Sequence, residues 1–342
     1  MTPVATATVD ALRAELSKQP DLAVTPLRLR GVELARVRPL RWLWPRRLPI
    51  GYLSLLLGAE GVGKGTLLAW IIAAATRGQL HGDLDGTPVR VLVVGDEDSF
   101  DSVTVPRLFA AGADLALVDT LAEDELDLSR DAPRLAGAVR AGGHELVLFD
   151  QLLDNLGGDV DDWRSKQVRD ALRPLRHVVR ELDITALASL HPNKGARSNF
   201  RDLVSGTHAF NALSRSSLLL APDPSDEERR VLVRGKGNLS APPPSFEFAI
   251  TGRNVELNGH TFDVPLVTDQ GDGELSVDDL LKPAREAPVR DTLADQIDAL
   301  GTGAVQTRAD IARKLLRDPD DRSVGRALDQ LDPGSAVGGH AK

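Results

Sequence analysis

The chain has 342 residues, of which 42% are hydrophobic, and its formal net charge is -9 at neutral pH. This size and apolar content allow one large α/β core and one small additional unit. Because the sequence contains no cysteine, disulfides, thiolate metal sites and cysteine nucleophiles are excluded. No apolar run reaches the roughly 20 residues of a membrane-spanning helix, and the amino terminus lacks the layout of a signal peptide. We therefore expect a cytoplasmic protein with no membrane partner.

Residues 1–40 combine a short amphipathic pattern, Val9–Leu16, with the start of an arginine-rich stretch. The arginines of that stretch are Arg28, Arg30, Arg36, Arg38, Arg41, Arg46 and Arg47. A net negative protein does not coat nucleic acid with its whole surface, although a local basic channel is compatible with that charge. The stretch fits a solvated or interface segment at least as well as a DNA contact.

Buried-strand patterns alternate with helical patterns over residues 41–265. The predicted strands are 53–57, 89–94, 115–118, 146–149, 184–190 and 216–220, and the predicted helices are 66–76, 133–141 and 163–182. This alternation predicts an α/β fold with a mostly parallel sheet covered by helices on both faces. Three later segments, 230–238, 246–250 and 254–257, predict an antiparallel addition at the sheet edge.

Residues 266–290 are rich in Asp, Gly and Pro, as expected of a linker. Residues 291–342 follow as a small helical unit, with helical patterns at 291–300, 307–316 and 322–331. Three short helices with a glycine-containing turn resemble a helix-turn-helix or winged-helix domain. A helical cap or protein-contact module fits the same pattern equally well.

A glycine-rich stretch follows the first predicted core strand and begins the next helix. It consists of Gly58, Ala59, Glu60, Gly61, Val62, Gly63, Lys64, Gly65 and Thr66. In such a context glycines let backbone N–H groups turn toward phosphates, and the lysine contacts the β and γ oxygens. This pattern predicts an ATP site with Mg²⁺. Because Gly65 replaces the usual Ser or Thr after the lysine, Thr66 is the expected Mg²⁺ ligand, either directly or through water.

Two further predicted strands end in carboxylates. The strand 145–149 ends at Asp150, which we expect to hold the hydration shell of the metal. The strand that begins at Val91 ends in Asp96, Glu97 and Asp98, and we assign the catalytic base to Glu97. Asp96 and Asp98 are the alternatives for that role, and a solvated acidic turn is the alternative for the whole group.

Polar and basic residues follow the strand at 184–190. His191 stands at the carboxyl end of this strand, where ligands of open α/β sheets bind, so a γ-phosphate sensor is expected there. The next residues include Lys194, Arg197 and Arg201, which could grip the backbone of single-stranded DNA. An ordinary surface loop has the same composition.

Arg234 and Lys236 are two residues apart on a predicted strand. This spacing places side chains on one face of a regular strand, so both could reach one anionic target. Such a pair can complete the ATP site of a neighbouring subunit. Edge-strand cations that discourage aggregation are the alternative.

Together these motifs resemble RecA-superfamily ATPases of the RepA type, which are related to the ring-shaped DnaB-like replicative helicases. The similarity covers roughly residues 40–250 and extends from the Trp-Leu-Trp-Pro sequence to Arg-Gly-Lys-Gly-Asn. It implies a RecA-like fold and a homo-hexameric ring with ATP between subunits. By the same resemblance Glu97 is the catalytic glutamate, Asp150 the Walker B acid and His191 the sensor. Arg234 and Lys236 are then the cations supplied in trans.

Three functions fit this sequence. The first is a DNA-dependent ATPase or helicase that replicates a plasmid, phage or mobile element. The second is a regulatory ATPase that uses ATP to switch assembly without moving DNA. The third, a small-molecule kinase, is disfavoured because no compact lid with clustered arginines follows the P-loop.

Overall fold

The computed structural model describes residues 37–95, 99–121, 126–157, 160, 164–191, 210 and 213–281, apart from the side chain of residue 236. Backbone contacts divide the chain into two units, Met1–Pro39 and Leu40–Lys342. All elements below belong to the second unit. The helical patterns expected before residue 37 and after residue 281 lie outside the described residues. Within the described residues, no helix has both the length and the apolar character needed to cross a membrane.

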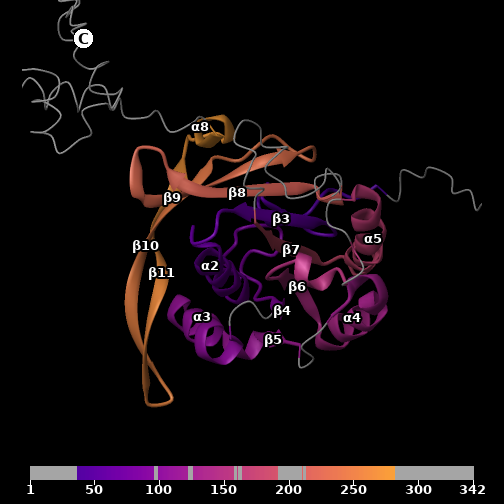
Figure 1. Cartoon of the computed structure of the whole chain (residues 1–342), viewed down its shortest axis with the longest axis horizontal. Coiled ribbons are helices and arrows are strands. Elements are labelled where there is room, and N and C mark those ends of the chain that lie inside the picture. The colour runs from indigo at the N-terminus through magenta and orange to yellow at the C-terminus, as the bar shows by residue number, and fades with distance from the viewer. Residues whose placement is uncertain are drawn as a thin grey trace, which may run out of the picture. The chain divides into compact units, whose positions relative to one another are not determined.

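Nine strands of the described residues form one sheet, in the order β11-β10-β9-β8-β3-β7-β6-β4-β5 (Figure 1). Their bounds are β3 (Leu53–Gly58), β4 (Arg90–Val94), β5 (Val118–Thr120), β6 (His144–Phe149), β7 (Thr185–Leu190), β8 (Ser216–Asp223), β9 (Asp226–Gly237), β10 (Ser245–Leu257) and β11 (His260–Gly273). Pairing is parallel from β8 through β5 and antiparallel from β8 through β11. The predicted mostly parallel sheet with an antiparallel edge is confirmed.

Helices cover both faces of this sheet. They are α2 (Lys64–Thr76), α3 (Val105–Ala111), α4 (Leu128–Gly142), α5 (Ser165–Leu182) and the short α8 (Val277–Leu281). Side chains of α4, α5 and α8 belong to one apolar cluster, and those of α2 and α3 belong to the other. Residues along β3 alternate between the clusters, since Leu55 lies in the first and Leu56 in the second. The sheet is therefore buried on both sides where it is parallel.

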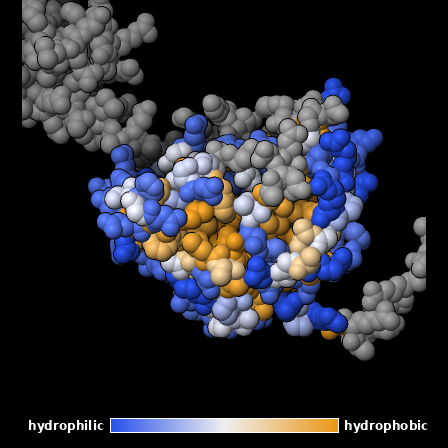
Figure 2. Space-filling model, turned by 90° about the horizontal axis from the view of Figure 1, so that it is seen from below, coloured by the Kyte–Doolittle hydropathy of each residue, from blue (hydrophilic) through white to orange (hydrophobic). Residues whose placement is uncertain are grey.

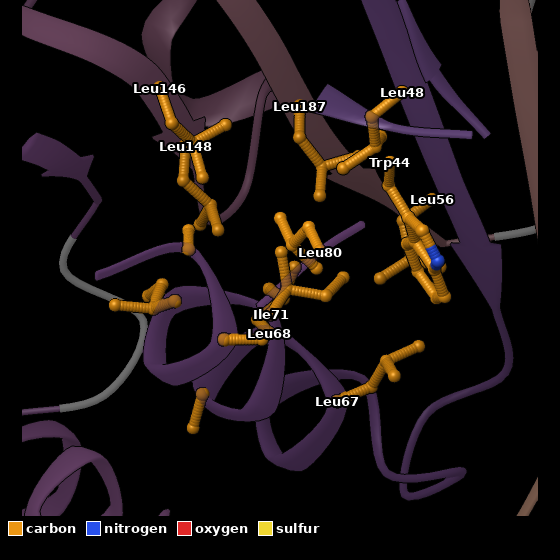
Figure 3. Close-up of a cluster of buried hydrophobic side chains, with 14 of the residues drawn as sticks. Trp44, Leu48, Leu56, Leu67, Leu68, Ile71, Leu80, Leu146, Leu148 and Leu187 are labelled. Carbon is orange, nitrogen blue, oxygen red and sulfur yellow. The ribbon is translucent and has the colours of Figure 1, made fainter. Parts of the chain in front are cut away.

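The second cluster fixes the helix that follows the glycine-rich stretch. In Figure 3, Leu56, Leu146, Leu148 and Leu187 from the strands face Leu67, Leu68 and Ile71 of α2. A small hairpin of β1 (Trp42–Trp44) and β2 (Leu48–Pro49) adds Trp44 and Leu48 beside them. Burial of these leucines holds α2 against the sheet, so its amino terminus has one position relative to the strand ends.

Two predicted elements differ from the observed ones. Leu115–Leu117 forms a 3₁₀ turn, and the strand begins only at Val118. The reason is local, because the side chain of Asp114 accepts a hydrogen bond from the Ala116 N–H at 3.1 Å. The predicted strands 246–250 and 254–257 form one continuous strand, β10.

The strand β11 was not predicted, and it occupies the first part of the expected linker. It pairs with β10 from Leu257↔His260 to Ser245↔Gly273, and α8 follows. The two strands are joined at Asn258 and Gly259, whose φ values of 51° and 77° suit a tight hairpin turn. The elements of the described residues thus include β11 and α8, which lie within or next to the expected linker 266–290.

The surface is mostly polar. Figure 2 shows apolar residues gathered near the middle of the face seen from below, with hydrophilic residues around them. Among the described residues, the large apolar side chains that are strongly exposed are Val37, at 71%, and Phe109, at 44%. The other large apolar side chains described are therefore wholly or partly buried.

Candidate active site

The glycine-rich stretch lies between β3 and α2, as expected. Gly61 and Gly63 have φ values of 72° and 102°, in the region that favours glycine. Gly63 precedes the first residue of α2 and has no side chain to cap that helix, and the first turn of α2 contains no acidic residue. The backbone N–H groups of the first turn can therefore bind an anion, as in phosphate sites.

Two residues from the antiparallel strands support this loop. The Arg230 Nε of β9 donates to the carbonyl oxygen of Val62 at 3.1 Å. Ile250 of β10 covers Gly63 so closely that a Cβ on residue 63 would lie 2.3 Å from the Ile250 Cδ1. The conformation of the loop therefore depends on the antiparallel edge as well as on its own glycines.

Lys64 is buried, with 8% of its surface exposed. Its Nζ donates to the carbonyl oxygens of Gly58 at 2.9 Å and Ala59 at 3.2 Å. The same ammonium lies 3.1 Å from the Nδ1 of His191, which follows the last residue of β7. The structure thus brings together the predicted phosphate-binding lysine and the predicted sensor.

Both ring nitrogens of His191 have side-chain partners. An ammonium group only donates, so the Nδ1 of His191 accepts from Lys64. The Nε2 of His191 lies 2.9 Å from the Nε2 of the Gln151 side-chain amide, so the second ring nitrogen is held by Gln151. A chain of three side chains links the P-loop to the residue after Asp150.

Asp150 follows the last residue of β6, and its Oδ1 accepts a hydrogen bond from the Ser189 Oγ at 2.7 Å. A small cavity of about 30 Å³ lies beside it, lined by Gly65, Gly95, Thr104 and Arg107 among others. The carboxylate thus faces the first turn of α2, on the side where Gly65 has no side chain. Thr66, the other expected metal ligand, is 6% exposed on the same turn.

The donor set around Asp150 fits Mg²⁺ bound together with ATP. Within the part of the chain that the structure describes, no three His, Asp or Glu side chains cluster as they would around a metal held by protein alone. Magnesium instead keeps several waters and takes one or two carboxylates plus phosphate oxygens. One carboxylate beside a phosphate loop meets that requirement.

Several expected site residues lie outside the described residues. These are Asp96, Glu97 and Asp98 after β4, and Lys194, Arg197 and Arg201 after His191. Their neighbours in the chain are described. Gly95, which precedes the acidic residues, contacts the backbone of Asp150, and His191 precedes the basic segment. Both segments therefore start at the carboxyl edge of the parallel strands, where the P-loop is also found.

Arg234 lies in a less accessible place than its expected role requires. Its guanidinium donates to the carbonyl oxygen of Arg46 at 2.6 Å and to the Ser240 Oγ at 2.9 Å. Burial lowers the pKa of this guanidinium, and the nearby Arg46 lowers that pKa further.

The expectation that Arg234 and Lys236 share one face of a strand assumed regular pairing along β9, and this pairing is interrupted. On β9, Arg234 pairs with Leu218 whereas Lys236 pairs with Ser217, so one extra residue is inserted between them. The regular alternation of side chains on which the shared face depended is interrupted there. The trans role of Arg234 and Lys236 consequently has no support from strand periodicity and stays a prediction.

Among the polar residues that contact the site, sequence reasoning missed Gln151, Ser189, Arg107 and Arg230. Gln151 and Ser189 could have been found from the sequence. Gln151 directly follows the predicted site residue Asp150, and Ser189 is two residues before the predicted sensor His191. Arg230 and Arg107 could not, since their contacts depend on how β9 and α3 pack against the P-loop.

Comparison with known proteins places this site in a family. A family model described as an AAA domain, AAA_25, matches residues 18–197, which is more than half of the chain. The chain belongs to the AAA_25 family. The matched residues include the P-loop, Asp150 and His191. As a member of AAA_25, the chain is a P-loop ATPase.

One solved structure with a similar chain is that of an ATPase domain. The two share 13% sequence identity with a TM-score of 0.46, over 58% of this chain and 81% of that chain. No curated protein matches the sequence significantly.

Proposed function

We propose that this AAA_25 ATPase is a cytoplasmic, DNA-dependent enzyme that acts on single-stranded DNA as a homo-hexameric helicase. Its role would be in the replication of a plasmid, phage or mobile element. The observation that supports this most directly is the contact of Lys64 with His191, whose chain continues into the basic residues Lys194, Arg197 and Arg201. A phosphate-binding residue is thereby joined to the predicted DNA-binding segment.

Binding of ATP changes the partners of Lys64. Without a phosphate, the ammonium is held by two carbonyl oxygens and by His191. A triphosphate in the loop offers charged oxygens, and charge-assisted hydrogen bonds to them are stronger than those to neutral acceptors. Lys64 then turns to the β and γ oxygens and releases His191. The imidazole becomes able to contact the γ-phosphate or to reorient against Gln151.

Hydrolysis requires a base and a held metal. Mg²⁺ bound with ATP neutralises charge that develops on the phosphates. Asp150, positioned by Ser189, would hold the hydration shell of that ion, with Thr66 as the second predicted contact. Glu97, two residues after Gly95, would accept the proton of the attacking water. The cation that completes the site would come from Arg234 or Lys236 of a neighbouring subunit.

Loss of the γ-phosphate would reverse the change at Lys64. The ammonium would return to His191 and to the carbonyl oxygens of the loop. The segment that begins at residue 192 would then follow a histidine that is again hydrogen-bonded to Lys64. Basic residues in that segment would then bind and release the DNA backbone once per ATP hydrolysed. This cycle couples hydrolysis to DNA without any further domain.

The test is ATP hydrolysis measured with and without single-stranded DNA, together with the mass of the protein in solution. We expect stimulation by DNA and a six-subunit mass with ATP bound. The Glu97→Gln variant should bind ATP normally but hydrolyse it at least about a hundredfold more slowly. Asp96→Asn and Asp98→Asn serve as matched controls for that assignment. A hexamer that hydrolyses ATP equally fast with and without DNA would instead indicate a regulatory ATPase.

A further inference from the structure

A second pocket, of about 520 Å³, lies beside α2 and away from the P-loop. It is formed by the β1–β2 hairpin, the second half of α2, the start of β10 and the end of β11. None of its lining residues lines the small cavity at Asp150. Its size is within the range of sites that bind a nucleotide or a comparable ligand.

Positive charge at this pocket exceeds negative charge. Arg47 and Arg234 are buried, with 7% and 8% of their surfaces exposed, and Arg46 lies close to both. Asp272 provides an acid at this cluster, but its carboxylate is exposed and lies 3.5 Å from the Arg47 Nη2. The shorter bonds of Arg47 and Arg234 go to uncharged oxygens of Pro244, Arg46 and Ser240.

Buried guanidinium groups are unfavourable unless negative charge lies beside them, and the acid described at this cluster, Asp272, is exposed. Burial lowers the pKa of Arg47, while Asp272 offsets part of this effect and the charges of Arg234 and Arg46 add to it. Arg46 and Arg77 are exposed at the rim of the pocket, where the Arg77 guanidinium also donates to the side chain of Gln79 and to the carbonyl oxygens of Ala111 and Gly112. The pocket therefore suits an anionic ligand on a chain whose overall charge is negative.

The inner wall of the pocket is aromatic. Trp70 lies 4.8 Å from Phe246 and 5.4 Å from Trp44, measured between ring centroids. Trp44 and Phe246 are buried, whereas Trp70 keeps part of its surface exposed. The Arg47 guanidinium carbon lies 4.7 Å from the ring centroid of Trp44, which fixes the hairpin side of the wall. Trp70 is thus a partly exposed ring with rigid support behind it.

We propose that this pocket binds one nucleotide unit of a single-stranded nucleic acid, with the base against Trp70 and the phosphate facing Arg46 and Arg77. Planar bases stack on aromatic rings, and guanidinium groups bind phosphate oxygens through paired hydrogen bonds. An anion without a ring would leave Trp70 unused, and an apolar ligand would gain nothing from the positive charge of the arginines. The inference deepens the proposed function, because it gives the strand a contact on the body of the protein besides residues 194–201.

Binding of a fluorescein-labelled oligothymidylate to the full chain tests this pocket. Arg46→Glu should weaken binding about tenfold or more and lower the slope of log affinity against log salt by about one. Arg176→Glu on α5 makes the same charge change on the other face of the sheet and should leave both quantities unchanged. If the two variants bind the strand equally well, the pocket takes no strand.

Photocrosslinking of an oligomer that contains 5-iodouracil locates the base. An adduct on the peptide that carries Trp70 supports the proposal, and adducts confined to other peptides overturn it. Displacement of the oligomer by polyglutamate as readily as by unlabelled oligomer would also overturn it. If the unchanged protein and its variants hydrolyse ATP but none of them binds the oligomer, the DNA dependence of the proposed function is refuted. If Arg46→Glu binds the strand as well as the unchanged protein does, the pocket proposal is refuted and the proposed DNA dependence is unaffected.

Discussion

Gly95 and Asp150 meet where β4 and β6 end, so closely that a Cβ on residue 95 would lie 1.6 Å from the carbonyl oxygen of Asp150. The φ of Gly95 is 138°, which side chains rarely allow. We therefore expect Gly95→Ala to lower the free energy of unfolding by about 3 kcal/mol or more, since backbone must move against backbone. ATP affinity should fall with it, because the clash displaces Asp150.

Gly65→Ala is the matched control for this change. A Cβ on residue 65 would lie 2.6 Å from the Arg107 Nη1, the far end of a flexible side chain that can rotate away. Alanine also favours the helix in which residue 65 lies. Its stability should stay within about 1 kcal/mol of the unchanged protein. Chemical denaturation of both variants decides the point, and equal losses would contradict it.

Replacement of Lys64 by Met should abolish ATP binding while the fold survives. Methionine keeps the buried aliphatic volume of the lysine and removes only the ammonium, so no large cavity is opened. His191 loses a donor at its Nδ1, which is a local change. Titration with a fluorescent ATP analogue measures the loss, and circular dichroism checks the fold. Folded protein that still binds ATP at wild-type affinity would disprove the P-loop assignment of Lys64.

Asp119 on β5 should make stability depend on acid pH. Hydrogen bonds from Arg90 and then from His144 hold the pKa of Asp119 below its usual range. A carboxylate with a lowered folded pKa stabilises the protein above its unfolded pKa, about 3.9, and loses that effect as the pH falls through the folded value. Asp119→Asn should therefore be less stable at neutral pH, and the difference should shrink below about pH 4.

Thermal unfolding over a pH series measures this difference. Because the Asp119 side chain is 42% exposed, the effect should be small and should weaken in high salt. Asp278→Asn, at an exposed position of α8, is the control and should give parallel curves. A gap between Asp119→Asn and the unchanged protein that persists at pH 2 would show that packing, not charge, is responsible.

The parallel core and the P-loop could be predicted because their signals are local. A strand such as Leu53–Gly58 is buried on both faces, so its sequence is a nearly continuous apolar run. A glycine-rich loop that follows such a strand and precedes a helix is typical of a phosphate-binding site. The hairpin partner β11 was missed because its composition is that of a linker, rich in Asp and Gly. Its turn, Asn258-Gly259, was nevertheless visible in the sequence.

Contacts between distant segments could not be predicted. The support of the P-loop by Arg230 and Ile250 depends on the antiparallel edge curling over α2, which no local pattern encodes. The register shift between Arg234 and Lys236 has the same cause, because a bulge is set by the pairing of two strands. Periodicity therefore predicted the strand but not the bulge that lies between these two residues.

The last prediction concerns assembly, and it uses Lys236 because Arg234 already serves as a donor to Arg46 and Ser240 within its own chain. If Lys236 completes the ATP site of a neighbouring subunit, Lys236→Ala should bind ATP but fail to hydrolyse it. Glu97→Gln should fail for a different reason, the loss of the base. Mixed rings then contain some interfaces in which an intact Glu97 faces an intact Lys236 from the next subunit.

Those interfaces should restore part of the ATPase activity, because each site draws its base and its cation from different chains. The measurement is the ATPase rate of mixtures at varied ratios, with subunit exchange followed by fluorescence transfer between labelled variants. A rate that peaks at intermediate ratios requires two chains per site. Arg169→Ala, which removes a cation from α5, is the control and should hydrolyse ATP without being mixed with a second variant. If exchange is complete and the mixtures stay inactive, Lys236 acts within its own chain or has no role in hydrolysis.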